Sequence, residues 1–290
     1  MAKLVLIRII RSDGKVFVLG TGAWRILSDG LKGIDFPNFS VYSDKNGVGD
    51  GALLSGKRID DRDVQVKCKS TDPSANASIR EVTIPFFNPK YTFQIYITYH
   101  GVTKWIEGEL QGFACPSENI HRPMTLTVKF YCKDPMLKSV DDFGEDIASV
   151  NAGFGFPYVE THLDNDPVIP AYASIYNYNH EVTIKNDGDA ITYPRVTINF
   201  GGSALNPKIY KDDYYVRILD RFQDGDVVVI DFENCTIRKN GVNWIQHIDR
   251  SSSFTEMGLD VGDSKIGFTA DDGDGNMSVY VYYNKLYLGL

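Results

Sequence analysis

The stretch IPFFNPKYTFQIYITYHGVTKWIEGEL, residues 84–110, decides the fold of the first half of the chain. Aromatic and aliphatic residues crowd its first part, a His100–Gly101 pair interrupts it, and Glu107 and Glu109 stand near its end. Two apolar runs around such a short break predict a β-hairpin with a tight turn. Three roles fit this hairpin: an aromatic platform for a ligand, an active site with two carboxylates, or a scaffold that packs against another surface.

Alternation of apolar and polar residues continues through the rest of the chain. It is clearest in DVQVKCKS (residues 63–70), MTLTVKFYC (124–132) and RVTINF (195–200). This period of two is typical of strands that bury one face. Turn sequences such as Asn240–Gly241 separate the strands, and helical periodicity is weak. The sequence therefore predicts a mainly β protein built from antiparallel sheets.

The length of 290 residues favours two domains over one. The alternation stops between residues 133 and 156, where Pro, Gly and acidic residues interrupt every pattern. We therefore predict two successive antiparallel β domains, residues 1–140 and 157–290, joined by a linker at residues 141–156.

Composition excludes several functional classes. The formal net charge of −8 argues against a nucleic-acid binder, because neutralising phosphates requires clustered Lys and Arg. No apolar run is long enough for a membrane helix, and the start of the chain lacks the pattern of a signal peptide. We expect synthesis in the cytoplasm, no membrane partner and no specific nucleic-acid partner.

The cysteines have the spacing of neither a zinc site nor a disulfide framework. They are Cys68, Cys115, Cys132 and Cys235. We expect all four to be buried thiols.

Two motifs resemble catalytic or nucleotide-binding sites. Glu107 and Glu109 share one face of a strand, as a glycosidase pair could, but hydrolases usually take their two carboxylates from different elements. GALLSGKR, residues 51–58, is close to a phosphate-binding loop, but Arg58 occupies the hydroxyl position and a strand pattern follows it. We predict a mobile glycine-rich loop here, no catalytic residue, no cofactor and no enzymatic activity.

Two loops in the second half are candidates for binding. DDGDGN, residues 271–276, carries oxygen ligands that suit calcium, but Asp–Gly pairs favour tight turns, so we predict a hairpin tip and no metal. Trp244, with Asn243 and Gln246, is the best candidate for binding a glycan, since sugar sites combine an exposed aromatic with polar groups. Strand alternation over residues 241–248 leaves the exposure of Trp244 open.

Several motifs together resemble one known family. They are FFNPKYTFQIYITYHGVTKWIEGELQGF (86–113), TLTVKFYCKDP (125–135), GVGDGALLSGKRIDDRDVQV (47–66), TIKNDGDAITYPRVTINFGG (183–202) and VYVYYNKLYLGL (279–290). In this order they resemble the phage distal tail protein family, the siphovirus-type tail components. One departure is Lys133, where the family more usually has proline.

The resemblance implies a fold and a function. The first domain would be a ring-forming β-sandwich or barrel with at most a small helix, and the second a galectin-like β-sandwich. Six copies would form a ring in the virion, at the tail tip, that joins the tail tube to the host-recognition apparatus and lets the genome pass. Its partners would be other copies of the chain, the tail tube protein, a hub or tip protein and receptor-binding proteins. The alternative is a carbohydrate-binding module that attaches the tail tip to cell-wall polysaccharide of the host.

Overall fold

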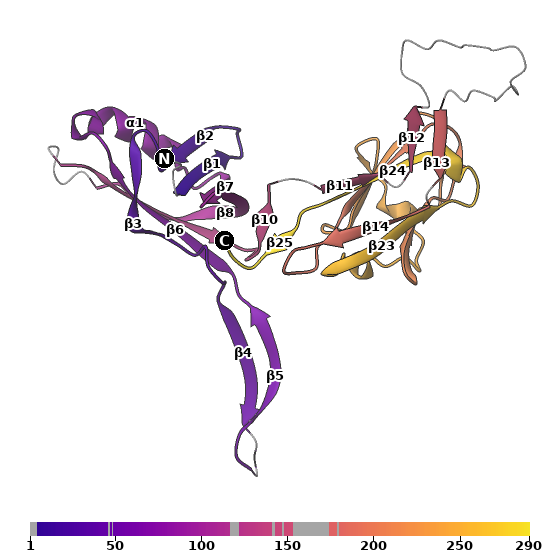
Figure 1. The fold of residues 1–290 in the computed structure, drawn as a ribbon, viewed down its shortest axis with the longest axis horizontal. Coiled ribbons are helices and arrows are strands. Elements are labelled where there is room, and N and C mark those ends of the chain that lie inside the picture. The colour runs from indigo at the N-terminus through magenta and orange to yellow at the C-terminus, as the bar shows by residue number, and fades with distance from the viewer. Residues whose placement is uncertain are drawn as a thin grey trace, which may run out of the picture. The chain divides into compact units, whose positions relative to one another are not determined.

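The computed structural model describes residues 5–45, 47, 49–116, 122–140, 143–146, 148–152, 174–178 and 180–290. The chain divides into two compact units: Met1–Val140 together with Leu286–Leu290, and Asp141–Lys285. Every strand pair within the described residues is antiparallel, and both units consist mainly of strands (Figure 1). The predicted mainly β fold is confirmed.

The first unit is built on a nine-stranded sheet within the described residues. Seven of its strands follow the order β2-β1-β7-β8-β9-β6-β3, and β10 pairs with β8 and with β25. The strands are β1 (Val5–Arg11), β2 (Val16–Leu19), β3 (Trp24–Lys32), β6 (Arg62–Ser70), β7 (Thr92–Tyr99), β8 (Val102–Ala114), β9 (Thr125–Cys132), β10 (Leu137–Ser139) and β25 (Leu286–Tyr287).

From Thr92 onward, the opening stretch of the sequence forms the hairpin β7–β8 in the middle of this sheet, whereas residues 84–86 are helical. His100 and Gly101 have φ angles of 47° and 90°, the left-handed conformation that a two-residue hairpin turn requires. Phe93, Ile95 and Ile106 are at most 1% exposed. Of the three roles considered for the hairpin, the structure supports the scaffold, because its aromatic and aliphatic residues fill the core.

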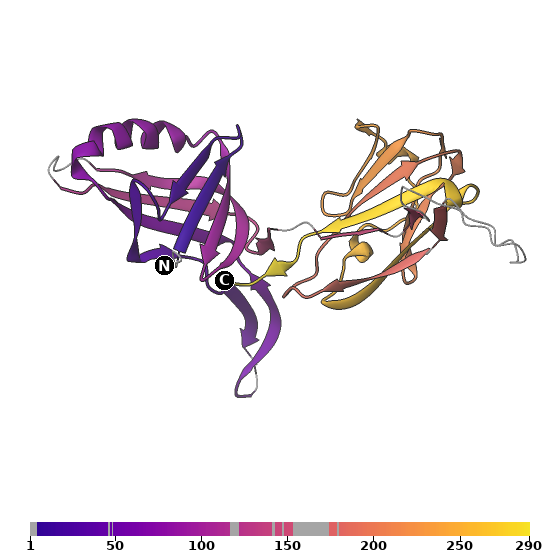
Figure 2. The ribbon, with the colours of Figure 1, turned by 45° about the horizontal axis from the view of Figure 1, so that its top comes forward.

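One α-helix, α1 (Asn76–Phe86), occurs in the described part of the first unit. A short 3-10 helix, η1 (Pro73–Ala75), precedes it, and the Asp72 side chain caps η1 by accepting from the Ser74 amide at 2.9 Å. Figure 2 shows α1 lying along one side of the sheet. No helix in the described residues is both long and apolar enough to cross a membrane.

The alternating segments bury the expected faces. Val64 and Val66 of β6, and Val128 and Phe130 of β9, are completely buried. Burial raises the pKa of the Cys68 thiol to about 12. The expectation of four buried thiols is nevertheless wrong for Cys235, which is exposed and has a φ of 51°, because it lies in a tight turn between two strands rather than within one.

The second unit is a β-sandwich. One sheet has the order β11-β24-β15-β20-β21-β22 and the other β14-β23-β17-β18. The first sheet comprises β11 (Phe143–Asp146), β24 (Met277–Tyr283), β15 (Arg195–Phe200), β20 (Val227–Asp231), β21 (Thr236–Lys239) and β22 (Val242–Asn243). The second comprises β14 (Glu181–Asn186), β23 (Gly262–Thr269), β17 (Lys208–Lys211) and β18 (Tyr214–Arg217). Ile198 and Ile230 from one sheet and Ile266 and Phe268 from the other share one core and are at most 1% exposed.

Short elements complete both units. They are the strand pairs β4 (Phe39–Lys45) with β5 (Ala52–Ile59), β12 (Ala148–Ala152) with β13 (Ser174–Tyr178), and β16 (Ala204–Leu205) with β19 (Arg221–Phe222), and the 3-10 helices η2 (Ile245–His247), η3 (Thr255–Met257) and η4 (Asp274–Asn276).

The units differ from the predicted domain limits in two places. The proposed linker, residues 141–156, contains β11 and β12, and β11 pairs with β24 of the second unit. Leu286–Leu290 group with the first unit, where β25 pairs with β10. Local patterns could not indicate either feature, because each strand is short and its partner lies more than one hundred residues away.

Candidate assembly surface

The most exposed apolar surface of the first unit lies on the hairpin β4–β5, which we name the arm. Its strands pair from Phe39↔Ile59 to Lys45↔Ala52, with a register shift between Tyr42 and Ser43. No residue of either strand is buried. In Figures 1 and 2 the arm extends from the sheet on the side away from α1.

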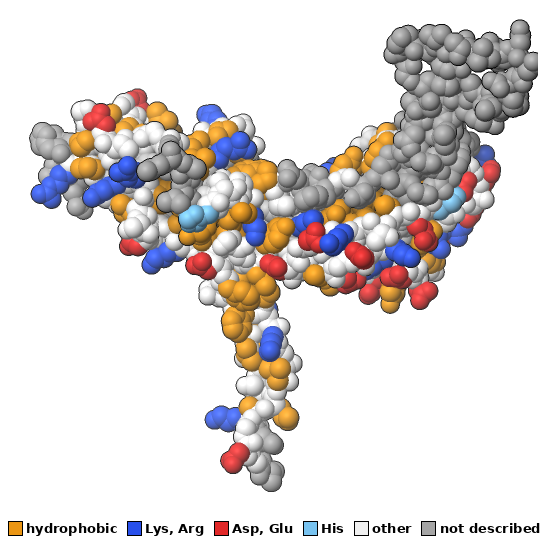
Figure 3. Space-filling model, viewed as in Figure 1, with side chains coloured by type: hydrophobic (Ala, Val, Ile, Leu, Met, Phe, Trp, Pro, Cys, Tyr) orange, Lys and Arg blue, Asp and Glu red, His pale blue; other side chains and the backbone are white. Residues whose placement is uncertain are grey.

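The arm is rich in apolar side chains that touch little else. Leu53 is 66% exposed, Phe39 61% and Leu54 59%, and Tyr42 and Val41 are at least half exposed. Figure 3 shows these apolar side chains gathered along the arm. An isolated two-stranded hairpin is only marginally stable in water. Extended exposed apolar surface usually marks a contact with another molecule.

The base of the arm is held by a few local contacts. The Ser40 hydroxyl donates to the Asp60 carboxylate at 2.6 Å, and the Asp60 amide donates to the Asn38 carbonyl at 2.9 Å. Phe36 packs edge-on against Phe39, with 6.0 Å between the ring centroids. These contacts lie at the base of the arm, and in its outer part the Ser55 hydroxyl donates to the Asp44 carboxylate.

GALLSGKR therefore does not form the mobile loop expected from its glycines. Residues 52–59 are strand β5, and the next element is the strand β6. A phosphate-binding loop needs a helix directly after it, whose free amides hold the phosphate. Residues 52–58 of this motif pair with β4 instead. Because β4 lies outside the motif, the motif alone could not indicate this pairing.

A second apolar surface lies between α1 and β2, and we name it the α1–β2 groove. Two adjoining hollows of about 350 and 400 Å³ share Val16, Phe17 and Val82 in their linings. Val82 on the helix is 66% exposed and Val16 on the strand is 54% exposed. The groove is therefore apolar and open to solvent.

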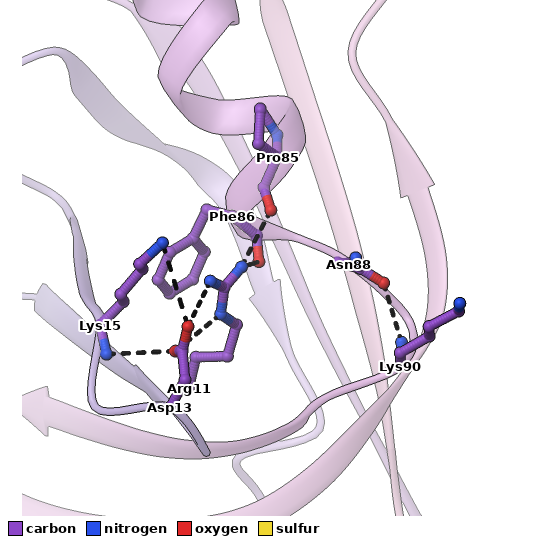
Figure 4. Close-up of polar contacts among 7 residues, drawn as sticks. All are labelled: Arg11, Asp13, Lys15, Pro85, Phe86, Asn88 and Lys90. Carbon is purple, nitrogen blue, oxygen red and sulfur yellow. Dashed lines mark hydrogen bonds and ion pairs between the residues drawn. The ribbon is translucent and has the colours of Figure 1, made fainter.

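Arg11 fixes one end of this groove (Figure 4). Its guanidinium is 5% exposed and donates to the carbonyls of Pro85 and Phe86 at 2.9 and 2.8 Å. These are carbonyls of the last turn of α1, which have no partner within the helix. The same guanidinium pairs with Asp13 at 2.6 Å and lowers the pKa of that carboxyl to about 2. Arg11 thereby joins the turn after β1 to the end of α1.

Glu107 and Glu109 lie two residues apart on strand β8. Both are exposed on the outer face of β8, opposite Gln94 and Thr92 of β7. No group of three or more potential metal ligands occurs in the described residues. The two glutamates therefore form part of a solvated sheet face.

Asn243, Trp244 and Gln246 lie close in sequence but do not form a single face. Residues 245–247 are the 3-10 helix η2, so the strand alternation expected over residues 241–248 is wrong beyond Asn243. The side-chain oxygen of Asn243 accepts from the Ile245 amide at 3.1 Å, and this turn ends the strand. Asn243 and Gln246 are exposed.

The indole of Trp244 is engaged by its neighbours. Its ring is stacked on His247, with 4.4 Å between centroids and 9° between planes. Its N–H donates to Asp220 at 3.0 Å, and the Lys239 ammonium lies 5.3 Å from the ring centroid. Trp244 is half-buried and packs against the core of the sandwich. Glycan binding by these residues stays a prediction.

The DDGDGN segment is a connection between β23 and β24, and its residues 274–276 form η4. Asp271 accepts hydrogen bonds from Asn206 and Arg217, and these two contacts lower the pKa of its carboxyl. Asp271 thus binds one residue of β18 and one residue of the turn between β16 and β17 in the same unit.

The comparison with known protein families gives a match in the second half of the chain. Residues 187–287 match the family model described as siphovirus-type tail component, C-terminal domain. The second unit carries a siphovirus-type tail component domain. The resemblance expected from the motifs is therefore confirmed, and the matched residues cover most of the described sandwich. No curated protein sequence matches the chain.

Solved structures extend the similarity over both units at the level of the fold. The crystal structure of the SPP1 Dit protein, described as a paradigm of the hub adsorption apparatus in phages that infect Gram-positive bacteria, has a TM-score of 0.64 at 12% identity and covers 97% of this chain and 98% of that chain. A chain of the phage P2 baseplate in its activated conformation with Ca has a TM-score of 0.57 at 11% identity, with 97% and 98% covered. At these identities, the matches show that both units share the fold of those chains.

Proposed function

We propose that the chain forms a ring of six copies that joins a phage tail tube to the host-recognition apparatus at the tail tip. The arm carries this proposal, because it presents apolar side chains that the described part of its own chain does not cover. The family match of residues 187–287 and the fold similarity to the Dit and baseplate chains support a place in a phage tail.

The partners follow from this position. A ring between tube and tip contacts other copies of the chain, the tail tube protein, a hub or tip protein and receptor-binding proteins. The genome passes through its lumen. A formal net charge of −8 suits this passage, because an acidic chain offers few phosphate contacts that would hold DNA.

The mass of the assembled protein tests the proposal. Native mass spectrometry of the full chain at micromolar concentration should give a multiple of six subunits. Leu53→Glu, which places a charge on the most exposed large apolar residue of the arm, should reduce the assembly to smaller species. Val242→Glu is the matched control, since Val242 is 61% exposed in the second unit. A wild-type chain that stays monomeric at all concentrations would contradict the proposal.

The alternative function, attachment to cell-wall polysaccharide through the second unit, makes a separate prediction. It requires Trp244 to present a free ring face to a sugar. The stacking of Trp244 on His247 does not favour it. A glycan array probed with wild-type protein and with Trp244→Ala tests it, and binding that disappears in the variant supports it.

A further inference from the structure

Residues 286–290 follow the second unit in the chain but are bound by the first unit. Their strand, β25, pairs with β10 of the first unit (Figure 1). The amide of Leu290 donates to the carbonyl of Ile34 at 3.0 Å. The side chains of Tyr287 and Leu290 pack against the core of the first unit. The first unit therefore holds this segment by backbone hydrogen bonds and by apolar contacts.

Two cationic side chains of the first unit bind carbonyls of the same segment. Arg62 is buried, and its guanidinium donates to the carbonyl of Leu288 at 2.5 Å. The ammonium of Lys104 donates to the carbonyl of Gly289 at 2.7 Å and lies 3.7 Å from the ring centroid of Tyr287. Hydrogen bonds from charged donors are stronger than those between neutral groups. The segment therefore occupies a site that specific side chains of the first unit build, in addition to its strand pairing.

The segment is nevertheless less firmly enclosed than the main strands of the sheet. All residues from 286 to 290 are half-buried. Among the described strands, β25 has two residues and pairs only with β10, which has three. By contrast, β9 has eight residues, lies between β8 and β6, and buries every second side chain. Short and partly exposed elements open at a lower free energy than core strands, so we expect the segment to detach more readily than the sheet unfolds.

The chain passes between the two units at two places. The first passage is residues 140–142, between β10 of the first unit and β11 of the second, and the other is residues 284–285, between β24 and β25. In the second unit, the ammonium of Lys285 pairs with Asp187 at 3.1 Å. The second passage is therefore held on both sides, by Lys285 in one unit and by residues 286–290 in the other. Relative motion is the general expectation for two domains joined by one linker, and a second held passage restricts it.

We propose that residues 286–290 are a latch that sets the freedom of the second unit. When the segment is bound at β10, Arg62 and Lys104, two held passages connect the units and the second unit keeps a narrow range of orientations. When the segment detaches, residues 140–142 alone hold the units together and the second unit reorients over a wider range. The proposal concerns a single chain, so it does not depend on the proposed ring.

Single-molecule fluorescence energy transfer between one dye in each unit measures this range of orientations. Cys235 is the exposed one among the four cysteines, and Lys90→Cys adds a labelling site at an exposed position of the first unit. At high dilution, the labelled full-length chain should give a narrow distribution of transfer efficiencies. A chain that ends at Lys285 lacks the latch and should give a broader distribution, because only one passage still holds the units. Distributions of equal width would overturn the proposal.

Lys104→Met tests the latch in the full-length chain, because it removes an ammonium that binds the segment. The amide of Leu290 should exchange with solvent at least about tenfold faster, and the distribution of transfer efficiencies should broaden. Lys129→Met is the matched control: Lys129 is an exposed residue of β9 in the same sheet, and its loss should change neither measurement.

Exchange at the amides of β9 shows whether the sheet stays folded in each variant. If the chain that ends at Lys285 fails this check, the result for Lys104→Met decides. A Lys104→Met chain with wild-type exchange at Leu290 and a wild-type distribution would overturn the proposal. So would a wild-type chain in which the Leu290 amide exchanges as slowly as those of β9, because the segment would then open only with the whole unit.

Discussion

The guanidinium of Arg11 donates a hydrogen bond of 2.8 Å to the backbone carbonyl of Phe86, although the two residues lie 75 positions apart in the chain. The bond joins the first strand of the sheet to the C-terminal end of α1, next to the α1–β2 groove. A positive charge is favourable at this end of a helix, where carbonyls lack partners. Arg11 is thus one of the side chains that hold α1 on the sheet, together with Trp24, whose indole N–H donates to Thr83 at 3.3 Å.

Arg11→Met should lower the stability of the first unit. It removes the donors to the carbonyls of Pro85 and Phe86 and the ion pair with Asp13. Arg8→Met is the matched control, since Arg8 is an exposed residue of the same strand that lies over the ring of Tyr96. Denaturant titrations should show a lower midpoint for Arg11→Met and almost no shift for Arg8→Met. Equal midpoints would contradict this role for Arg11.

The Arg11–Asp13 pair should make stability depend on pH in acid. Asp13 has a pKa of about 2 in the folded chain, below the value of about 3.9 for an unperturbed Asp. A carboxyl with a lowered folded pKa stabilises the fold above its unfolded pKa, and this contribution is lost as the pH falls from about 4 to about 2. The difference in unfolding midpoint between wild type and Asp13→Asn should therefore be largest at neutral pH and should decrease below about pH 4. A difference that does not change with pH would count against the pair.

Trp244→Ala should destabilise the second unit by about 2–3 kcal/mol, less than a fully buried Trp would, because the side chain is half-buried but packed. It also leaves Asp220 without the indole donor. Gln246→Ala, at an exposed position of η2, should change the free energy of unfolding by less than about 0.5 kcal/mol. Chemical denaturation measures both. Unchanged stability of Trp244→Ala, together with loss of glycan binding, would instead support a sugar site.

Arg62→Leu should destabilise the first unit by about 3 kcal/mol. Arg62 is 2% exposed and donates to the carbonyls of Gly33, Asp35 and Leu288 at 2.9, 2.8 and 2.5 Å. Its substitution leaves these acceptors without their donor and frees the last residues of the chain. Hydrogen exchange should become faster at the amides of β25 and of its partner β10, and exchange in the second unit should stay unchanged.

Limited proteolysis tests the domain division. The first cut should fall within residues 133–156, where strand alternation is absent, and should give two β-rich fragments. Because β25 pairs with β10, the fragments should stay together under native conditions and separate only in denaturant. A first cut inside residues 84–132 would contradict the boundary.

The predictable parts of the fold are those with a strong local pattern. Alternation over β6, β9 and β15 identified the buried faces, because the side chains of a strand point to opposite sides in turn. His100–Gly101 and Asn240–Gly241 identified two tight turns, since both pairs adopt positive φ angles. The order of motifs along the chain was also sufficient to indicate the tail component family.

The predictions were wrong or remained open where the structure of a segment depends on contacts with residues far away in the sequence. GALLSGKR suggested a loop but forms β5, since pairing with β4 outweighs the flexibility of its glycines. The residues of the groove gave no local signal, because α1 and β2 are separate in sequence and line the same hollows only in the folded chain.

The sequence by itself determined the β class, the buried faces of the main strands and the turns, because these depend on residues that are neighbours in the chain. Only the tertiary structure decided that β11 pairs with β24, that Leu286–Leu290 return to the first unit, and that the arm and the groove are exposed on different sides of one sheet. These features arise from contacts between residues far apart in the sequence. Such contacts depend on how the strands order themselves in a sheet, and no local pattern encodes that order.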